Sequence, residues 1–175
     1  MINDEEKIDE IDKQIIEIIQ KEPTITHTDI AKRVERSQPT IGMRINRLEE
    51  LGILQFQAGL NLKVADMFYA RAEINTDHPE DLLEQIDKCH FMLNAFRLSG
   101  TTNISVLLAN SRISFLDKLV NFKFRDNPLV KEVQMNIITE VVEDFVLPID
   151  LNFDECDCEL RNECVNSWNI AKSEK

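Results

Sequence analysis

The chain of 175 residues carries 20 basic and 32 acidic side chains, for a net charge of −12, and 43% of its residues are hydrophobic. That apolar share is ordinary for a globular protein and predicts a folded core. No apolar run approaches the roughly 20 residues of a membrane-spanning helix, and the acidic N-terminus does not resemble a secretory signal. The four cysteines do not form the dispersed framework of a secreted disulfide scaffold. We therefore expect a cytoplasmic protein with no membrane partner.

The first part of the chain predicts two helices in succession. Isoleucines at helical spacing between residues 8 and 19 mark the apolar stripe of a first helix that ends near Gln20. A second, shorter helix spans residues 28–34 and has Thr28 as its expected N-cap. A tight turn leads from this second helix into a third.

The stretch from Ser37 to Gly52 predicts a third helix with chemical signals at both ends. Ser37 is a good N-cap, Pro39 fits the first turn where no backbone donor is needed, and Gly52 suits a left-handed residue after the last turn. One face of this helix is apolar and leaves the opposite flank free for contacts. The apolar residues are Ile41, Ile45 and Leu48.

A local excess of positive charge accompanies this third helix. Between residues 32 and 47, five basic residues stand against one acid, which gives +4 in a chain whose total is −12. Such a basic surface is typical of contact with a phosphate backbone, although exposed helices also carry these charges for solubility alone. The succession of helices is a helix-turn-helix, whose later helix enters the major groove of DNA.

We therefore expect double-stranded DNA as a partner. The two arginines of the third helix are predicted to contact phosphate or guanine, its polar N-terminal residues base edges, and its methionine a thymine methyl group. The predicted DNA-binding residues are Lys32, Arg33, Ser37, Gln38, Thr40, Met43, Arg44, Asn46 and Arg47.

The remainder of the chain alternates between strand and helix patterns. Residues 52–59 alternate partly and predict the strand of a wing. The later segments are a strand at 68–74, a helix from 79, a hairpin at 92–98 and 103–109, a helix at 113–124, and a strand-rich stretch at 130–145. The order β-α-β-β-α-β predicts a ferredoxin-like domain. The fold class is therefore α+β, with a winged helix-turn-helix domain at 1–60, a ferredoxin-like domain at 61–148 and an acidic tail at 149–175.

Three local sequences carry a resemblance to a known family: 8–12 (IDEID), 30–33 (IAKR) and 44–53 (RINRLEELGI). Over about residues 7–148 the chain resembles the Lrp/AsnC family, the feast/famine regulators of bacteria and archaea. The resemblance implies a DNA-binding transcription regulator that is not an enzyme. It also implies a homodimer formed through the C-terminal sheet, further assembly, and a small-molecule effector such as an amino acid.

The expected effector site lies in the turn between the middle strands. Family members often carry a Gly-Asp-Tyr-Asp loop there, whereas this chain keeps the glycine and has Thr-Thr-Asn after it. The predicted effector-binding residues are Ser99, Gly100, Thr101, Thr102 and Asn103; the alternative is that they only make a tight turn.

A second function class is an enzyme similar to the siroheme decarboxylases, which share this architecture. Such an enzyme needs histidine or arginine in a haem-like pocket and does not need a basic third helix. The histidines of this chain are His27, His78 and His90. The basic helix favours the regulator.

The tail beyond Pro148 extends past the resemblance. Its three cysteines, in the pattern C-x-C with a third six residues on, predict a site for zinc, an iron–sulfur cluster or another thiolate-bound metal. The predicted metal ligands are Cys156, Cys158 and Cys164. A reversible thiol switch and thiols without a role are the alternatives.

Three ligands are one short of a closed structural zinc site. The fourth ligand is open among His78, His90, a carboxylate and a residue of a partner subunit. Cys89 is interpreted as a core residue instead, because it continues the helical spacing of Leu82 and Ile86.

Overall fold

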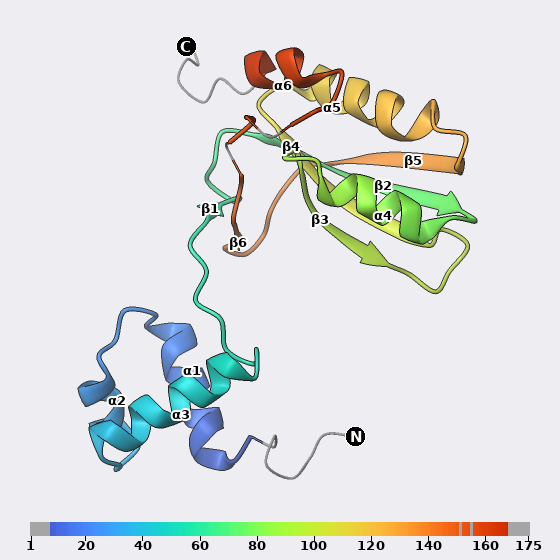
Figure 1. Cartoon of the computed structure of the whole chain (residues 1–175). Helices are drawn as coiled ribbons and strands as arrows, with labels where there is room; N and C mark the ends of the chain where they lie inside the picture. Colours follow the sequence, from blue (N-terminus) through green and yellow to red (C-terminus); the bar gives the residue numbers. More distant parts are fainter. Residues whose placement is uncertain (1–7, 151, 155, 168–175) are drawn as a thin grey trace. The chain divides into compact units, whose positions relative to one another are not determined.

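The computed structural model describes residues 8–150, 152–154 and 156–167. The chain divides into two compact units, Met1–Gln57 and Ala58–Lys175, each with its own hydrophobic core (Figure 1). The predicted α+β class, with a helix-turn-helix unit followed by a mixed unit, is confirmed. In the described part of the chain, no helix combines the length and apolarity needed to cross a membrane.

The first unit is a bundle of three helices, as predicted. They are α1 (Glu10–Lys21), α2 (His27–Arg33) and α3 (Gln38–Glu50). Apolar side chains at helical spacing on all three helices meet in one core, because each helix alone can bury only one stripe. The buried members are Ile15, Ile19, Ile30, Ala31, Val34, Ile41, Ile45, Leu48 and Leu54.

The ends of α3 follow the local chemistry, whereas the start of α2 does not. Ser37 caps α3 by accepting the Thr40 N–H at 3.3 Å, and Gly52 takes a φ of +67° after the last turn, as predicted. The predicted cap at Thr28 is wrong. Thr26 caps α2 instead, because the helix begins at His27 and places Thr28 inside its first turn.

The predicted wing strand at 52–59 is also wrong. No strand is present there, and the first strand after α3 is β1 (Leu60–Asn61), which pairs with β6 (Val146–Leu147) in the second unit. Gly59 makes this pairing possible: a Cβ at this position would lie 2.2 Å from the carbonyl oxygen of Leu147. Residues 52–59 alternate partly between apolar and polar side chains, but they have no neighbouring strand to pair with and therefore form no strand.

The second unit is built on a four-stranded antiparallel sheet in the order β3-β4-β2-β5. Its elements are β2 (Phe68–Thr76), α4 (Pro79–Asp87), β3 (Met92–Arg97), β4 (Ile104–Asn110), α5 (Ile113–Val120) continuing into the π-helical turn η2 (Asn121–Arg125), and β5 (Val130–Ile138). This is the predicted β-α-β-β-α-β order, with β3 and β4 as the predicted hairpin.

The two faces of the sheet have different environments. Ala72, which is paired with Val106 and Met135 on its neighbours, faces a core shared with α4 and α5. Tyr69, which is paired with Ala109 and Ile138, lies on the opposite face in a smaller apolar cluster. The helices therefore cover one face of the sheet, whereas residues outside the helices, such as Leu62 and Leu147, pack against the apolar cluster on the other face.

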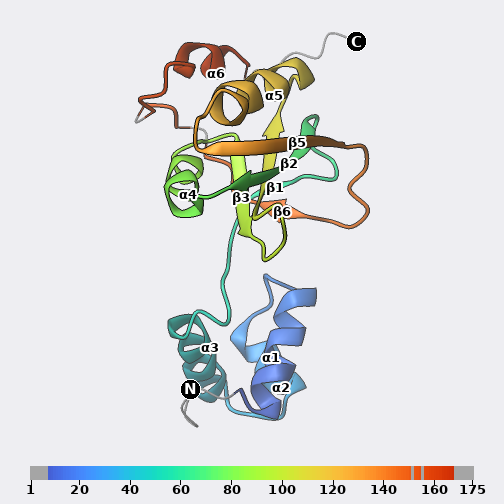
Figure 2. The same cartoon turned by 90° about the vertical axis from the view of Figure 1, so that its right-hand side faces the viewer.

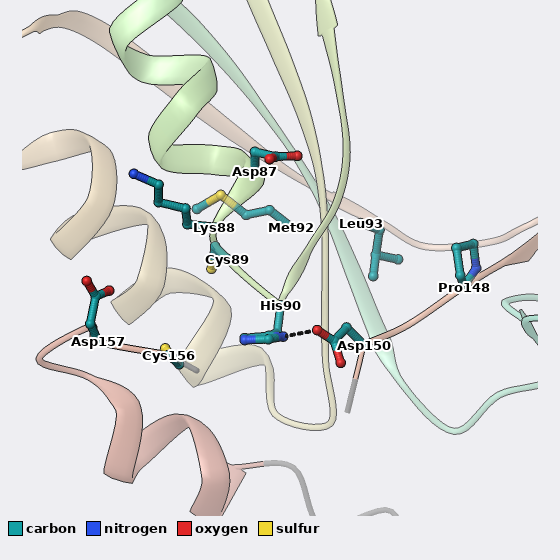
Figure 3. A pocket seen from close by; sticks show the side chains of 10 residues that line it. All are labelled: Asp87, Lys88, Cys89, His90, Met92, Leu93, Pro148, Asp150, Cys156 and Asp157. Atoms are coloured by element: carbon teal, nitrogen blue, oxygen red, sulfur yellow. Dashed lines mark ion pairs between the residues drawn. The ribbon is translucent and has the colours of Figure 1, made fainter. Parts of the chain in front are cut away.

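The described part of the tail is packed on the second unit. Helix α6 (Arg161–Ser167) lies beside α5 in both views (Figures 1 and 2). Leu160 and Cys164 are buried in the main core of this unit. The Asn110 amide donates to the Ser167 hydroxyl at 3.0 Å, and both side chains are fully buried. The start of the tail lies close to the second unit as well, since Asp150 Oδ2 is 2.9 Å from His90 Nδ1 (Figure 3).

Candidate nucleic-acid interface and a cysteine-lined cavity

Helix α3 presents an exposed face opposite its buried residues. Met43 is 68% exposed, which is unusual for a large apolar side chain on a helix that also has a buried face. Asn46, three residues further along the helix, is exposed beside it; Gln38 at the first position of the helix and Ser37 at the cap are also exposed, and Thr40 is half-buried. These five predicted DNA-binding residues are therefore brought together on the N-terminal and outer side of α3.

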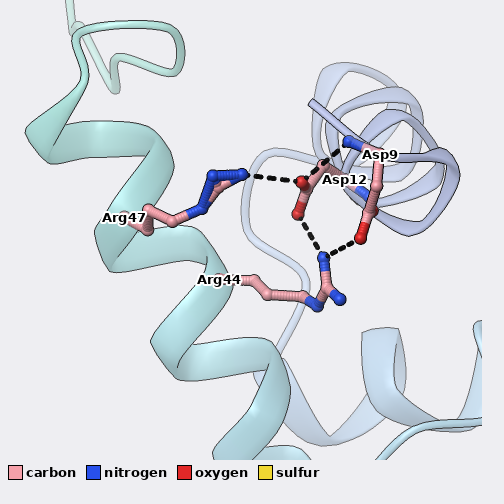
Figure 4. A network of polar contacts seen from close by, with 4 residues as sticks. All are labelled: Asp9, Asp12, Arg44 and Arg47. Atoms are coloured by element: carbon pink, nitrogen blue, oxygen red, sulfur yellow. Dashed lines mark hydrogen bonds and ion pairs between the residues drawn. The ribbon is translucent and has the colours of Figure 1, made fainter. Parts of the chain in front are cut away.

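Arg44 and Arg47 point toward α1 (Figure 4). Arg44 Nη1 lies 2.8 Å from Oδ1 of Asp12 and 2.7 Å from Oδ2 of Asp9, and Arg47 Nη2 lies 3.1 Å from Oδ2 of Asp12. The Asp12 side chain is 0% exposed, so its charge depends on these two arginines. The two arginines thus join α3 to α1, a role that the sequence analysis missed; their contact with DNA stays a prediction.

The same network forms the N-terminal cap of α1. Asp9 accepts the Asp12 N–H at 2.8 Å, and Asp12 accepts the Asp9 N–H at 3.1 Å, which makes a reciprocal capping box. The Asp12 N–H and then the Arg44 guanidinium hold the pKa of Asp9 below its usual value. Hydrogen bonds to Asp12 and Asp9 raise the pKa of Arg44. Both groups therefore stay charged at neutral pH.

The remaining cations of the basic segment make only surface contacts. Lys32 pairs with Asp29 at 3.0 Å, and Arg33 makes two hydrogen bonds to Glu22, at 2.7 and 2.8 Å, all between exposed side chains. Exposed pairs of this kind contribute little to stability, so a phosphate group can replace the carboxylate with little loss.

Arg36 is the cation of this segment that the sequence analysis did not include among the DNA-binding residues. Its Nη1 donates to the Glu35 carbonyl at 2.9 Å, and within the described ranges no carboxylate pairs with it. Glu35 has a φ of +54° in the turn between α2 and α3. Arg36 follows it and is exposed immediately before Ser37, the cap of α3.

The predicted effector residues form the turn between β3 and β4. Asn103 is used by the fold: its Nδ2 donates to the Thr76 carbonyl at 2.7 Å and its Oδ1 accepts the Thr76 N–H at 3.1 Å. Ser99 and Thr101 are exposed and Thr102 is half-buried. Gly100 has no positive φ, so the turn itself does not require glycine there. Effector binding by these five residues stays a prediction.

All four cysteines line one small cavity of about 10 Å³ in the second unit. The interpretation of Cys89 as a core residue only is therefore incomplete. Helix α4 ends at Asp87, so Cys89 lies beyond it and, while it packs against the core, it also faces the cavity with the three cysteines of the tail. The polar and aromatic residues that also line it are Lys88, His90, Phe91, Lys123 and Phe153.

A larger cavity of about 560 Å³ adjoins this one (Figure 3). The two share four lining residues: Lys88, Cys89, His90 and Cys156. Three carboxylates, Asp87, Asp150 and Asp157, line the larger cavity. Carboxylates therefore lie in the cavity next to the four thiols.

The thiols are not all alike. Burial, together with the nearby Cys89, Cys158 and Cys156 thiols, raises the pKa of Cys164 to about 12. Burial also raises the pKa of Cys89. None of the cysteines forms a disulfide. Across 8–150, 152–154 and 156–167, no group of three or more His, Cys, Asp or Glu side chains is placed to hold a metal ion.

Comparisons with known proteins agree with this architecture. Residues 8–55 match the winged helix-turn-helix DNA-binding family. An uncharacterised helix-turn-helix-type transcriptional regulator of Pyrococcus furiosus is 24% identical over 144 residues, which cover 77% of this chain and 89% of that protein. The structure of Escherichia coli AsnC aligns with a TM-score of 0.69 and 16% identity, over 79% of this chain and 98% of AsnC.

The chain thus has the AsnC/Lrp fold. A transcriptional regulator of Neisseria meningitidis, solved in complex with L-Met, has the same fold, with a TM-score of 0.67 and 21% identity over 81% of this chain and 97% of that one. The range matched by the winged helix-turn-helix DNA-binding family, residues 8–55, includes all of α3. The four cysteines lie outside that range.

Proposed function

We propose that this AsnC/Lrp-type protein is a sequence-specific transcription regulator that acts in the cytoplasm and reads DNA with the outer face of α3. The observation that carries the proposal is the exposure of Gln38, Met43 and Asn46 on a helix whose opposite face is buried. The major groove is about 12 Å wide and admits a helix of this kind. Amide side chains read base edges there, and an exposed apolar side chain suits a thymine methyl group.

Phosphate contacts are assigned to the cations that precede α3. Lys32, Arg33 and Arg36 are exposed, and their present partners are exposed carboxylates or a backbone carbonyl. Replacing such partners by phosphate releases counterions from DNA, which is the main source of affinity in contacts of this type.

Replacing Arg36 with alanine is expected to weaken binding to every DNA sequence by up to about tenfold at low salt, because one phosphate contact is lost. The slope of log affinity against log salt concentration should fall by about one. The measurement is fluorescence anisotropy across a salt series, using a duplex selected from a random pool by the wild-type protein.

Lys131→Ala is the matched control, because it removes one exposed cation from the second unit, where Lys131 pairs with Asp77. Its salt slope should equal that of the wild type. An unchanged slope for Arg36→Ala would remove Arg36 from the interface. Failure of the wild type to select any sequence would contradict the proposed function itself.

We further propose a homodimer formed through the face of the sheet that α4 and α5 leave uncovered. Leu107 and Ile138 are only partly buried and supply an apolar patch on that face, next to the buried Tyr69. Phe96 extends the patch: it pairs with Ser105 in the register and is 51% exposed. Two copies of a helix-turn-helix unit on one dimer fit two half-sites, one helical turn of DNA or a multiple of it apart.

Introducing Phe96→Glu is expected to dissociate this dimer, because a buried unpaired carboxylate would oppose its own copy across a two-fold axis. Sedimentation velocity should then show a monomer where the wild type sediments as a dimer. The control is Phe56→Glu, an equally exposed phenylalanine of the first unit at 52%. A dimer that persists in Phe96→Glu would place the interface elsewhere.

A small-molecule effector belongs to the same proposal. The Asn103 side chain already makes two hydrogen bonds to the backbone of Thr76. The side chains of that turn that remain to recognise an effector are therefore Ser99, Thr101 and Thr102. We propose a regulator and not an enzyme. His27 and His78 are exposed at the starts of α2 and α4, and His90 lines the cavity with the four thiols. The three histidines therefore do not line one common pocket, which gives no support to binding of a haem-like substrate.

A further inference from the structure

We propose that the four cysteines of this chain together form a tetrahedral thiolate site for Zn²⁺ or another soft divalent cation. The ligands are Cys89, Cys156, Cys158 and Cys164. This inference stands on the second unit alone and does not depend on DNA binding.

The ligand count is the first argument. The tail supplies three thiols, and Cys89, which lies 67 positions before Cys156 in the sequence, supplies the fourth because all four side chains line the same cavity. All four are free thiols, so none is consumed by a disulfide. Four cysteines are a complete ligand set for a closed structural zinc site, and no residue of a partner subunit is needed.

The size of the cavity is the second argument. A volume of about 10 Å³ is close to that of one water-sized sphere, so the cavity can receive a single ion but no amino acid or nucleotide. In the structure the thiols surround this space without standing in coordinating positions. Neutral thiols do not attract one another. A cation that displaces their protons would draw the four sulfurs to about 2.3 Å from itself.

The surrounding charges are the third argument. Four thiolates around a divalent cation leave a net charge of −2, and Lys88 and Lys123 line the same cavity and offset it. The carboxylates of the adjoining cavity, Asp87, Asp150 and Asp157, would attract a cation to its neighbourhood. The site therefore has a ligand set, compensating charges and an acidic surface beside it that concentrates cations.

Binding would connect the end of α4 to the tail. Cys89 follows α4, Cys158 precedes α6, and Cys164 lies within α6. One cation at this place would join two segments that are far apart in sequence, the loop after α4 and the tail, and would release up to four protons to solvent. The folded second unit should therefore be stabilised by the ion in proportion to its affinity.

The test uses the full chain, reduced and treated with a chelator, and titrated with Zn²⁺ against a chromophoric chelator. We expect one Zn²⁺ per chain, X-ray absorption that shows four sulfur neighbours at about 2.3 Å, and a higher unfolding temperature in the presence of Zn²⁺. Cys89→Ser should lower the affinity by at least about tenfold. Glu159→Gln is the matched control, because this carboxylate follows Cys158 directly but does not line the cavity.

Cys156→Ser provides a second variant in case Cys89→Ser does not fold, since Cys156 is only half-buried and its replacement should leave the circular dichroism spectrum unchanged. It should show the same loss of affinity. Absence of Zn²⁺ binding by the wild type would overturn the proposal. The proposal would also be overturned if a folded Cys89→Ser or Cys156→Ser variant bound Zn²⁺ with the affinity of the wild type. If the chain does not bind Zn²⁺ but forms an internal disulfide when treated with oxidised glutathione, the metal site is wrong and the cysteines act as a thiol switch instead.

Discussion

Replacing Arg44 and Arg47 together by alanine is expected to destabilise the first unit strongly. Both arginines pair with Asp12, whose side chain is 0% exposed, so the double variant leaves a buried carboxylate without a cation. Removing the partners of a buried charge costs about 3–5 kcal/mol, a large part of the 5–15 kcal/mol that stabilises a typical domain. Urea unfolding followed by circular dichroism should show the early loss of one helical transition. DNA binding should disappear with it.

A hydrophobic replacement of the whole network separates folding from DNA contact. In Asp12→Leu/Arg44→Met/Arg47→Met the buried charge is removed along with its partners, and such swaps are often neutral or stabilising. The triple variant should therefore unfold at about the wild-type urea concentration. Its DNA affinity then reports the direct contribution of the two arginines. Wild-type stability in the double alanine variant would show that Asp12 does not depend on these two cations.

The features that the sequence predicted correctly are those determined by neighbouring residues. Ser37 caps α3 because its hydroxyl reaches the N–H of Thr40 three residues later, and Gly52 ends the helix because it accepts a positive φ without strain. The order of strands and helices in the second unit follows from the alternation and helical spacing of apolar residues. Each of these signals lies within one helix or strand.

The features that it missed depend on partners distant in sequence. The charge count treated every arginine between residues 32 and 47 as available to DNA, but Asp12, 32 positions before Arg44, holds two of them. The acidic pair Asp9 and Asp12 at the start of α1 is the signal that would have indicated this. Cys89 fits the helical spacing of α4, and nothing in the sequence shows that the helix ends at Asp87 and that Cys89 faces the tail.

Replacing Leu160 with alanine is expected to destabilise the second unit by about 2–4 kcal/mol. Leu160 lies in the tail that the sequence analysis separated from the ferredoxin-like domain, yet only 7% of it is exposed, and it belongs to the same core as Leu116 and Leu119 of α5. Truncating a buried leucine removes its transfer free energy and leaves a cavity that the surroundings fill incompletely. Chemical unfolding of the second transition, monitored by circular dichroism, measures this loss.

Val165→Ala is the control, because Val165 lies on α6 only five residues further on and is 48% exposed. It should change the stability by less than about 0.5 kcal/mol. If Leu160→Ala were equally mild, the tail would be an appendage on a complete domain. A large loss confined to Leu160→Ala would instead mean that the sheet and its two helices do not form a complete core without residues beyond Pro148. In that case any ion held by the tail cysteines would act on the stability of the whole second unit.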